Sequence, residues 1–224
     1  MKVVVAIDSL KGSLSSLEAG SAISEGIHKV ITDAQVVVRP LADGGEGTVE
    51  ALALGMGGRI ETIQVTGPLG NAVEAAYGII DETKTAIIEM SAAAGITLVP
   101  EQDRNPLNTT TYGVGELISD AIENGCRNFI IGIGGSATND GGIGMLQALG
   151  YRFLDSNGNP VPFGAKGLSV LEAISDEHVI PQLKECRFQV ACDVTNTLCG
   201  EQGCSAIYGP QKGAIPSMIL QMDK

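Results

Sequence analysis

Residues 127–150 join a short apolar run to a helical pattern through a glycine-rich loop, RNFIIGIGGSATNDGGIGMLQALG. The β-branched run Phe129–Ile133 predicts a strand, and the pattern from Ile143 to Leu149 predicts a helix. Glycines leave the backbone N–H groups of the loop uncovered, and a helix that follows adds the positive end of its dipole. The sequence therefore predicts an anion-binding loop formed by Gly134, Gly135, Ser136, Ala137, Thr138, Asn139 and Asp140.

The side chains of this loop favour a phosphate with its Mg²⁺ over a bare carboxylate, because they supply hydroxyl, amide and carboxylate groups together. Two other interpretations stay open. Gly132, Gly134 and Ala137 fit the dinucleotide-binding pattern G-x-G-x-x-G/A. Asp155 then follows the next strand-like run, where an acid for ribose hydroxyls is expected. The pair Gly141-Gly142 weakens that reading, since each glycine costs a helix about 1 kcal/mol. The third interpretation is a glycine-rich turn that binds nothing.

Polar residues also follow two other predicted strands. The apolar run Val3–Ile7 leads directly into Asp8, Ser9 and Lys11. A second run, Phe188–Cys192, leads into Asp193 and Asn196. Ligands of open α/β sheets bind outside the carboxyl ends of the strands, so these side chains are candidates for a site. The alternative is that they are ordinary turn and loop residues.

A third acidic pair lies between the predicted strand Ala34–Pro40 and the predicted helix Val49–Leu54. Asp43 and Glu46 are separated by two glycines, which weaken a helix start and contribute nothing to packing. The pair is expected to hold a metal or substrate hydroxyls, unless it only forms a capping box. A lone cation, Lys212, stands in a glycine-containing loop near the carboxyl end of the chain, where it can reach phosphate oxygens.

The strand and helix patterns predict an α/β fold with a change of organisation near residue 66. Strands alternate with helices up to the strand Arg59–Thr66, and Gly67-Pro68-Leu69-Gly70 then predicts a strong turn. Val73–Ile80 and Lys84–Met90 predict a hairpin that interrupts the alternation. We therefore expect residues 1–66 and residues 67–224 to belong to two different α/β domains.

Composition and charge narrow the classes of partner. The 224 residues carry a net charge of −12, which argues against nucleic acid and acidic membranes as partners. The amino terminus has too short an apolar run for a signal peptide, and a cytoplasmic protein is expected. The Walker A pattern G-x-x-x-x-G-K-[ST] does not occur in the sequence. A phosphate site here therefore needs cations such as Lys11 and Lys212.

Five motifs together resemble the bacterial glycerate kinase family of the glycerate 2-kinase type: AIDSLKGSLS, PLADGGEGTVEA, IGIGGSATNDGG, VACDVTNTLCG and YGPQKGA. The resemblance implies two α/β domains, the first a discontinuous Rossmann-like parallel sheet and the second an inserted mixed domain, with the active site in the cleft between them. It also implies transfer of the γ-phosphoryl group of ATP to a hydroxyl of D-glycerate, giving 2-phosphoglycerate or 3-phosphoglycerate. Family members are longer, so an incomplete enzyme is expected. Assembly into a homo-oligomer stays open.

On this resemblance the loop 134–140 holds phosphate, and Lys11 and Lys212 neutralise the transferring or substrate oxygens. Asp193 is the candidate base, and Asp43 with Glu46 would hold Mg²⁺ or glycerate hydroxyls; these two assignments are interchangeable. The remaining residues expected to bind substrate are Asp8, Ser9 and Asn196. Two other functions stay open, an NAD-dependent oxidoreductase that uses the dinucleotide pattern and a non-catalytic anion-binding fragment.

Overall fold

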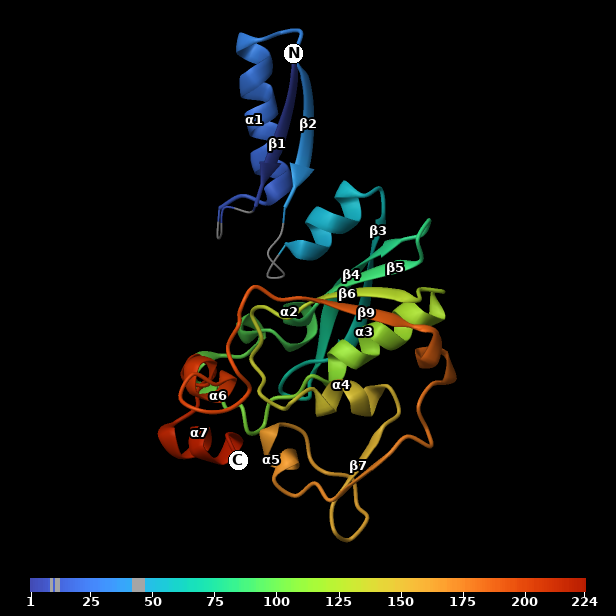
Figure 1. The fold of residues 1–224 in the computed structure, drawn as a ribbon, viewed down its shortest axis with the longest axis vertical. Coiled ribbons are helices and arrows are strands. Elements are labelled where there is room, and N and C mark those ends of the chain that lie inside the picture. The colour runs from blue at the N-terminus through green and yellow to red at the C-terminus, as the bar shows by residue number, and fades with distance from the viewer. Residues whose placement is uncertain (9, 11–12, 42–46) are drawn as a thin grey trace.

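The computed structural model describes residues 1–8, 10, 13–41 and 47–224 and has the expected α/β fold (Figure 1). Among these residues the strands form one five-stranded sheet and two two-stranded sheets. The strands are β1 (Lys2–Ile7), β2 (Gln35–Pro40), β3 (Arg59–Thr66), β4 (Ala72–Ile80), β5 (Thr85–Glu89), β6 (Asn128–Gly132), β7 (Arg152–Leu154), β8 (Ala173–Ser175) and β9 (Arg187–Ala191). The α-helices are α1 (Ser16–Val30), α2 (Met90–Ala94), α3 (Tyr112–Glu123), α4 (Ile143–Ala148), α5 (Ala165–Leu168), α6 (Cys204–Tyr208) and α7 (Pro216–Met222).

The five-stranded sheet has the strand order β3-β4-β5-β6-β9 and mixes two pairing modes. β3, β4 and β5 pair antiparallel, whereas β5, β6 and β9 run parallel. In the parallel part Glu89 pairs with Gly132, and Gly132 pairs with Ala191. The carboxyl ends of three strands therefore meet at one edge of the sheet, where α2 follows β5 directly and loops follow β6 and β9.

Both faces of this sheet are covered, which explains why its central strands are continuous apolar runs. On one face Ile79 packs with Leu117 of α3 in the main core. On the other face Ile80 packs with Ala53 of a helical segment that spans residues 48–55 and includes η1 (Glu50–Leu54). Neighbouring residues of β4 thus enter different cores, as the alternation of side chains along a strand requires.

The first elements of the chain form a unit of their own at one end of the molecule (Figure 1). β1 and β2 pair in parallel, and α1 packs against them. A capping box starts α1: the Glu18 N–H donates to Ser15 Oγ at 3.2 Å, and the Ser15 N–H donates to Glu18 Oε2 at 2.8 Å. The carboxyl ends of β1 and β2 point toward the part of the molecule that holds the five-stranded sheet (Figure 1).

The boundary predicted after residue 66 falls inside a hydrogen-bonded hairpin. β3 pairs with β4 along its whole length, from Arg59 opposite Ile79 to Thr66 opposite Ala72. The turn at Gly67–Gly70 is present, with the Gly67 N–H donating to the Asn71 carbonyl at 2.7 Å. It connects two strands of one sheet, so β3 lies with residues 67–224 and not with β1 and β2. The division of the chain into two domains otherwise stays a prediction.

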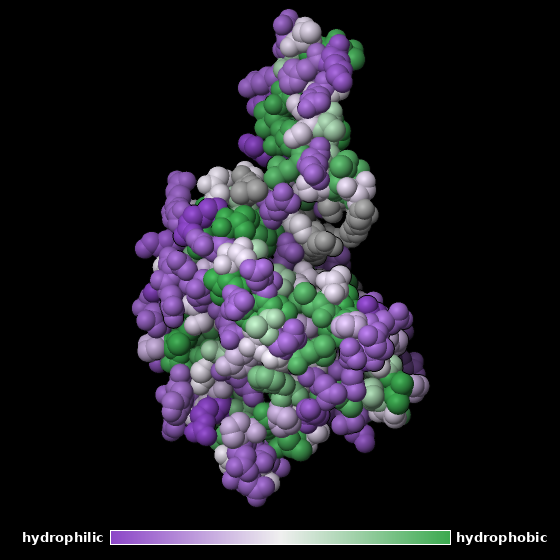
Figure 2. Space-filling model, turned by 180° about the vertical axis from the view of Figure 1, so that it is seen from behind, coloured by the Kyte–Doolittle hydropathy of each residue, from purple (hydrophilic) through white to green (hydrophobic). Residues whose placement is uncertain are grey.

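Hydrophilic side chains cover most of the surface seen from behind, with smaller hydrophobic areas between them (Figure 2). Within the described part of the chain, no helix combines the length and the apolar character that crossing a membrane requires.

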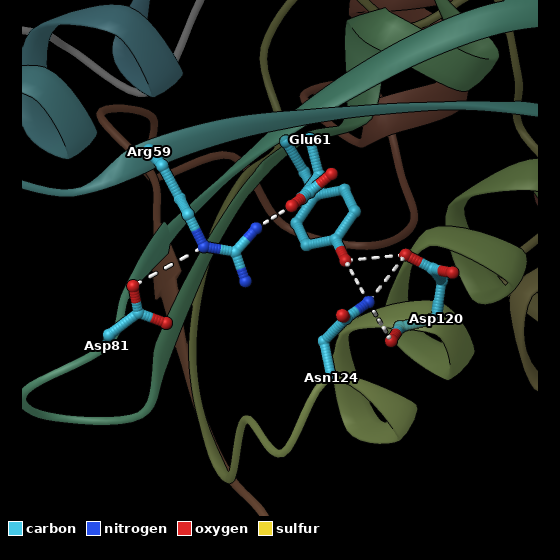
Figure 3. Close-up of polar contacts among 6 residues, drawn as sticks. Arg59, Glu61, Asp81, Asp120 and Asn124 are labelled. Atoms are coloured by element: carbon cyan, nitrogen blue, oxygen red, sulfur yellow. Dashed lines mark hydrogen bonds and ion pairs between the residues drawn. The ribbon is translucent and has the colours of Figure 1, made fainter.

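A buried polar contact fixes α3 to the sheet. The Tyr77 side chain of β4 is fully buried, and its hydroxyl donates to Asp120 Oδ2 at 2.5 Å. Asn124 Nδ2 donates to the same hydroxyl at 3.2 Å and to Asp120 Oδ2 at 3.1 Å (Figure 3). Burial, followed by the neighbouring Asp120 carboxylate, raises the pKa of Tyr77 above its ordinary value. Nearby, Arg59 pairs with Glu61 and Asp81 on the hairpin (Figure 3).

Replacing Tyr77 by Phe should lower the free energy of unfolding by about 1–2 kcal/mol, because Asp120 and Asn124 lose the hydroxyl to which they are hydrogen-bonded. Urea unfolding monitored by circular dichroism measures the change. Tyr151→Phe is the matched control, since the Tyr151 hydroxyl has no hydrogen bond to any residue the structure describes. Equal stability of the two variants would contradict a structural role for the Tyr77 hydroxyl.

Candidate active site

A pocket of about 460 Å³ lies beyond the carboxyl ends of β6 and β9. The loop after β6 contributes Gly134, Gly135 and Ser136, and the loop after β9 contributes Asp193 and Asn196. The remaining wall comes from α6 and from η5 (Pro210–Lys212), through Cys204, Tyr208 and Lys212. Four separate predictions from sequence thus meet at one place: the glycine loop, Asp193, Asn196 and Lys212.

The glycine loop is held from behind by backbone hydrogen bonds. The Ala137 N–H donates to the Ala94 carbonyl at 2.8 Å, and the Ile96 N–H donates to the Gly135 carbonyl at 2.8 Å. Gly135 has φ of 69°, a conformation that favours glycine. Among the described residues, the N–H groups of Gly134, Gly135 and Ser136 have no hydrogen-bond acceptor. These three amides line the pocket and are the part of the loop that can bind an anion.

The second half of the predicted loop is used inside the protein. Asp140 is 1% exposed, and its Oδ2 accepts from the Thr111 N–H at 2.9 Å, the Thr111 hydroxyl at 2.8 Å and the Gly144 N–H at 3.3 Å. Its Oδ1 accepts from the Gly142 N–H at 3.0 Å. The Asp140 carboxylate thus already binds amides at the amino terminus of α4, and a role for Asp140 in binding phosphate stays a prediction.

The other loop residues differ in what they face. Ala137 is buried, and its carbonyl accepts from the Thr109 hydroxyl at 2.9 Å. Thr138 is also buried. Asn139 Nδ2 donates to Ser205 Oγ at 2.9 Å and so links the loop to α6. Ala137, Thr138 and Asn139 thus brace the loop, while Gly134 to Ser136 face the pocket.

Lys212 connects η5 to the glycine loop. The side chain is 8% exposed, and its Nζ donates to the Thr138 carbonyl at 2.6 Å and to Ser136 Oγ at 2.9 Å. Burial lowers the pKa of Lys212, and Cys204 and Asp140 oppose that shift. The next residue, Gly213, has φ of 88°, and a Cβ there would stand 2.1 Å from the Arg104 carbonyl oxygen. Only glycine fits at this position, so the backbone itself holds Lys212 against the pocket.

Asp193 and Asn196 also line the pocket and are exposed. Asn196 Oδ1 accepts from the Tyr208 hydroxyl at 2.6 Å, and its Nδ2 donates to the Gln202 carbonyl at 3.0 Å. Both groups of the Asn196 amide are thus engaged by the protein, which makes Asn196 a brace for the loop that carries Asp193. The Asp193 carboxylate faces the pocket without being enclosed.

The remaining predicted residues belong to the first elements of the chain. Asp8 is half-buried directly after β1. Ser9, Lys11, Asp43 and Glu46 lie outside the described residues, and the roles predicted for them stay predictions.

The dinucleotide interpretation of Gly132, Gly134 and Ala137 is wrong for two structural reasons. The loop after Gly132 does not enter a helix until Ile143, so no helix start lies at the third position of the pattern. β7, which precedes Asp155, pairs with β8 in a separate sheet and not with β6. Asp155 Oδ1 accepts from the N–H groups of Asn157 and Asn159 in its own turn.

Glu89 lies next to the glycine loop and is not among the predicted site residues. It is the last residue of β5, pairs with Gly132 and is buried. The sequence carried one signal for it, an acidic residue at the end of an apolar strand. That signal is weak alone. Only the parallel pairing of β5 with β6, which the sequence does not show, places Glu89 beside the glycine loop.

The fold and the pocket are typical of α/β proteins that bind a ligand beyond the carboxyl ends of parallel strands. The family described as the glycerate kinase family matches residues 3–224, and the chain belongs to this family. It is 53% identical over 223 residues to "Glycerate 2-kinase" of Escherichia coli (strain K12), a match that covers 100% of the chain and 58% of that protein. It is 52% identical to "Glycerate kinase" of Haemophilus influenzae, with 100% and 59% covered.

A solved structure agrees with the fold. A crystal structure of a protein from Salmonella typhimurium LT2, provisionally named glycerate kinase 2, superposes with a TM-score of 0.94 at 52% sequence identity. The match covers 100% of this chain and 60% of that one. The chain thus spans less than two thirds of the length of these relatives.

Replacing Asp140 by Asn should destabilise the protein by about 1–3 kcal/mol, because an amide group cannot accept hydrogen bonds at both ends and leaves a buried N–H donor unpaired. Urea unfolding is the measurement. Asp155→Asn is the control, since Asp155 accepts backbone N–H groups in an exposed turn. If Asp140→Asn keeps full stability and only weakens nucleotide binding, the result supports the predicted role of Asp140 in binding phosphate.

Proposed function

We propose that this chain forms the phosphate-binding part of a kinase that transfers the γ-phosphoryl group of ATP to a hydroxyl of D-glycerate. The observation that carries the proposal is the pocket beyond β6 and β9, which combines three unpaired backbone amides with the cation of Lys212 and the carboxylate of Asp193. Phosphoryl transfer depends on positioning and charge neutralisation, and these groups supply both. The similarity to "Glycerate 2-kinase" of Escherichia coli supports 2-phosphoglycerate as the product.

The N–H groups of Gly134, Gly135 and Ser136 line the pocket, where they would donate hydrogen bonds to oxygens of the terminal phosphates. Lys212 adds a positive charge at the same wall in a chain whose net charge is −12. Because Lys212 is buried and hydrogen-bonded, its ammonium group is already oriented and needs no reorganisation when the phosphate charge moves.

Asp193 is assigned as the group that orients and deprotonates the glycerate hydroxyl. It lines the same pocket as Lys212, so an acceptor hydroxyl bound there could lie within reach of both the carboxylate and the phosphate. Asp8, Ser9 and Lys11, with Asp43 and Glu46, would complete the substrate side.

Mg²⁺ fits the donors of this site. Mg²⁺ prefers oxygen ligands and is commonly held by one or two carboxylates together with substrate phosphates. The described residues contain no group of three or more His, Cys, Asp or Glu side chains that could hold a metal ion by itself. Asp43 with Glu46, or in the interchanged assignment Asp193, would hold the ion. When bound with ATP, Mg²⁺ would neutralise negative charge on the phosphates.

The direct test is incubation of the chain with D-glycerate and MgATP, followed by ³¹P NMR, which separates 2-phosphoglycerate from 3-phosphoglycerate. Formation of the 2-phosphate is expected, and a reaction without glycerate is the control. MgATP binding without transfer would favour the alternative of a non-catalytic anion-binding fragment.

Asp193→Asn should lower kcat by roughly 10²-fold or more, because the amide cannot accept the hydroxyl proton. Steady-state kinetics with saturating ATP measures the change. Asp176→Asn removes the same charge at an exposed position outside the pocket and serves as the control. A variant with full kcat removes Asp193 from the role of base.

Lys212→Met keeps most of the aliphatic stem and removes the ammonium group, so kcat/KM for ATP should fall by roughly 10²-fold or more. Lys184→Met, at an exposed position, should leave the kinetics unchanged. Nucleotide affinity measured by calorimetry separates weaker binding from slower transfer. Unchanged kinetics in Lys212→Met would refute the phosphate contact.

A further inference from the structure

Glu89 joins two parts of the chain that the proposed mechanism uses separately. It ends β5 and is 8% exposed, and its Oε1 accepts the Val49 N–H at 2.7 Å. Val49 lies in the first turn of the helical segment 48–55, where N–H groups have no acceptor within the helix. A carboxylate at that position also interacts favourably with the helix dipole. Glu89 therefore caps a helical segment from a strand that is 40 residues away in sequence.

The second carboxylate oxygen faces the glycine loop. Glu89 Oε2 accepts from the Ser91 hydroxyl at 3.4 Å. Ser91 in turn lies against Gly135, where an added Cβ would be 3.3 Å from Ser91 Cβ. Contacts thus run from Val49 through Glu89 and Ser91 to Gly135. One end of this series is the start of the helical segment, and the other is a residue that lines the phosphate pocket.

A cavity of about 380 Å³ lies beside this series of contacts and is also lined by Glu89, Gly47, Val49 and Ala92. A buried carboxylate such as that of Glu89 is costly unless its hydrogen bonds are made. Val49 and Ala53 of the segment also pack in an apolar cluster, and such packing is not directional. The directional bond from Val49 to Glu89 adds a fixed position for the first turn.

We propose that Glu89 is a positioning residue, which fixes the chain directly after residues 42–46 at the edge of the sheet that carries Gly134 and Gly135. It acts through hydrogen-bond acceptance and not by touching the substrate. Its effect on catalysis rests on the proposed function, because Asp43 and Glu46 are the residues that precede the positioned segment. The effect of Glu89 on the position of the helical segment does not rest on the proposed function.

The test compares E89A and E89Q in the chain of 224 residues. Glutamine keeps an oxygen that can accept the Val49 N–H, whereas alanine keeps none. E82A is the matched control, since Glu82 is an exposed acid in the turn at the other end of β5. Amide hydrogen exchange measured by NMR reports the Val49 N–H, and the Leu117 amide of α3 reports global unfolding.

In E89A the Val49 amide should exchange at least about tenfold faster relative to Leu117, and in E89Q within about threefold of the unchanged protein. E82A should change neither amide. Unchanged exchange in E89A, or E89Q exchanging as fast as E89A, overturns the proposal. If E89A does not fold, the E89Q result decides.

Glycerate phosphorylation by the same variants separates positioning from direct contact. E89A should lower kcat/KM for glycerate about tenfold or more, and E89Q should restore it to within about threefold. Loss of activity in E89Q with slow Val49 exchange would assign Glu89 to substrate or Mg²⁺ and overturn a positioning role. If the unchanged chain does not phosphorylate glycerate, the proposed function fails, and the exchange measurement still decides the role of Glu89.

Discussion

The parallel pairing of β5, β6 and β9 is the constraint on which the site depends. It places Glu89, Gly132 and Ala191 in one row, so helix α2 and the loops after β6 and β9 leave the sheet at the same edge. The pocket is lined by residues of these two loops. Every group assigned to phosphate binding in the described residues is either in one of these loops or, like Lys212, braced against one.

Within this edge the chain separates groups that bind from groups that brace. Asp140 and Asn139 use their polar atoms on neighbouring backbone and side chains, and they leave the amides of Gly134 to Ser136 unpaired. Asp140 and Asp193 thus have different roles because they differ in exposure. Asp140 is enclosed and saturated by N–H and O–H donors, whereas Asp193 faces the pocket.

The sequence is sufficient to predict the strands of the five-stranded sheet, the glycine loop and the residues at strand ends, because these features are local. The pairing of β3 with β4 could not be predicted, since tertiary structure sets it and the turn at Gly67 is equally typical of a domain boundary. The hydrogen bonds of Asp140 could not be predicted either, because its donor Thr111 is 29 residues away. Glu89 was passed over because its partner, Val49, is 40 residues away.

The mixed sheet also implies an order of assembly. β3, β4 and β5 are joined by short turns, so their antiparallel pairing needs only small loops to close. The parallel pairings of β5 with β6 and of β6 with β9 require the long intervening stretches that contain α3, α4 and α5 to be gathered first. We therefore expect the hairpins to form before the parallel pairings, so that the ligand-binding edge matures late in folding.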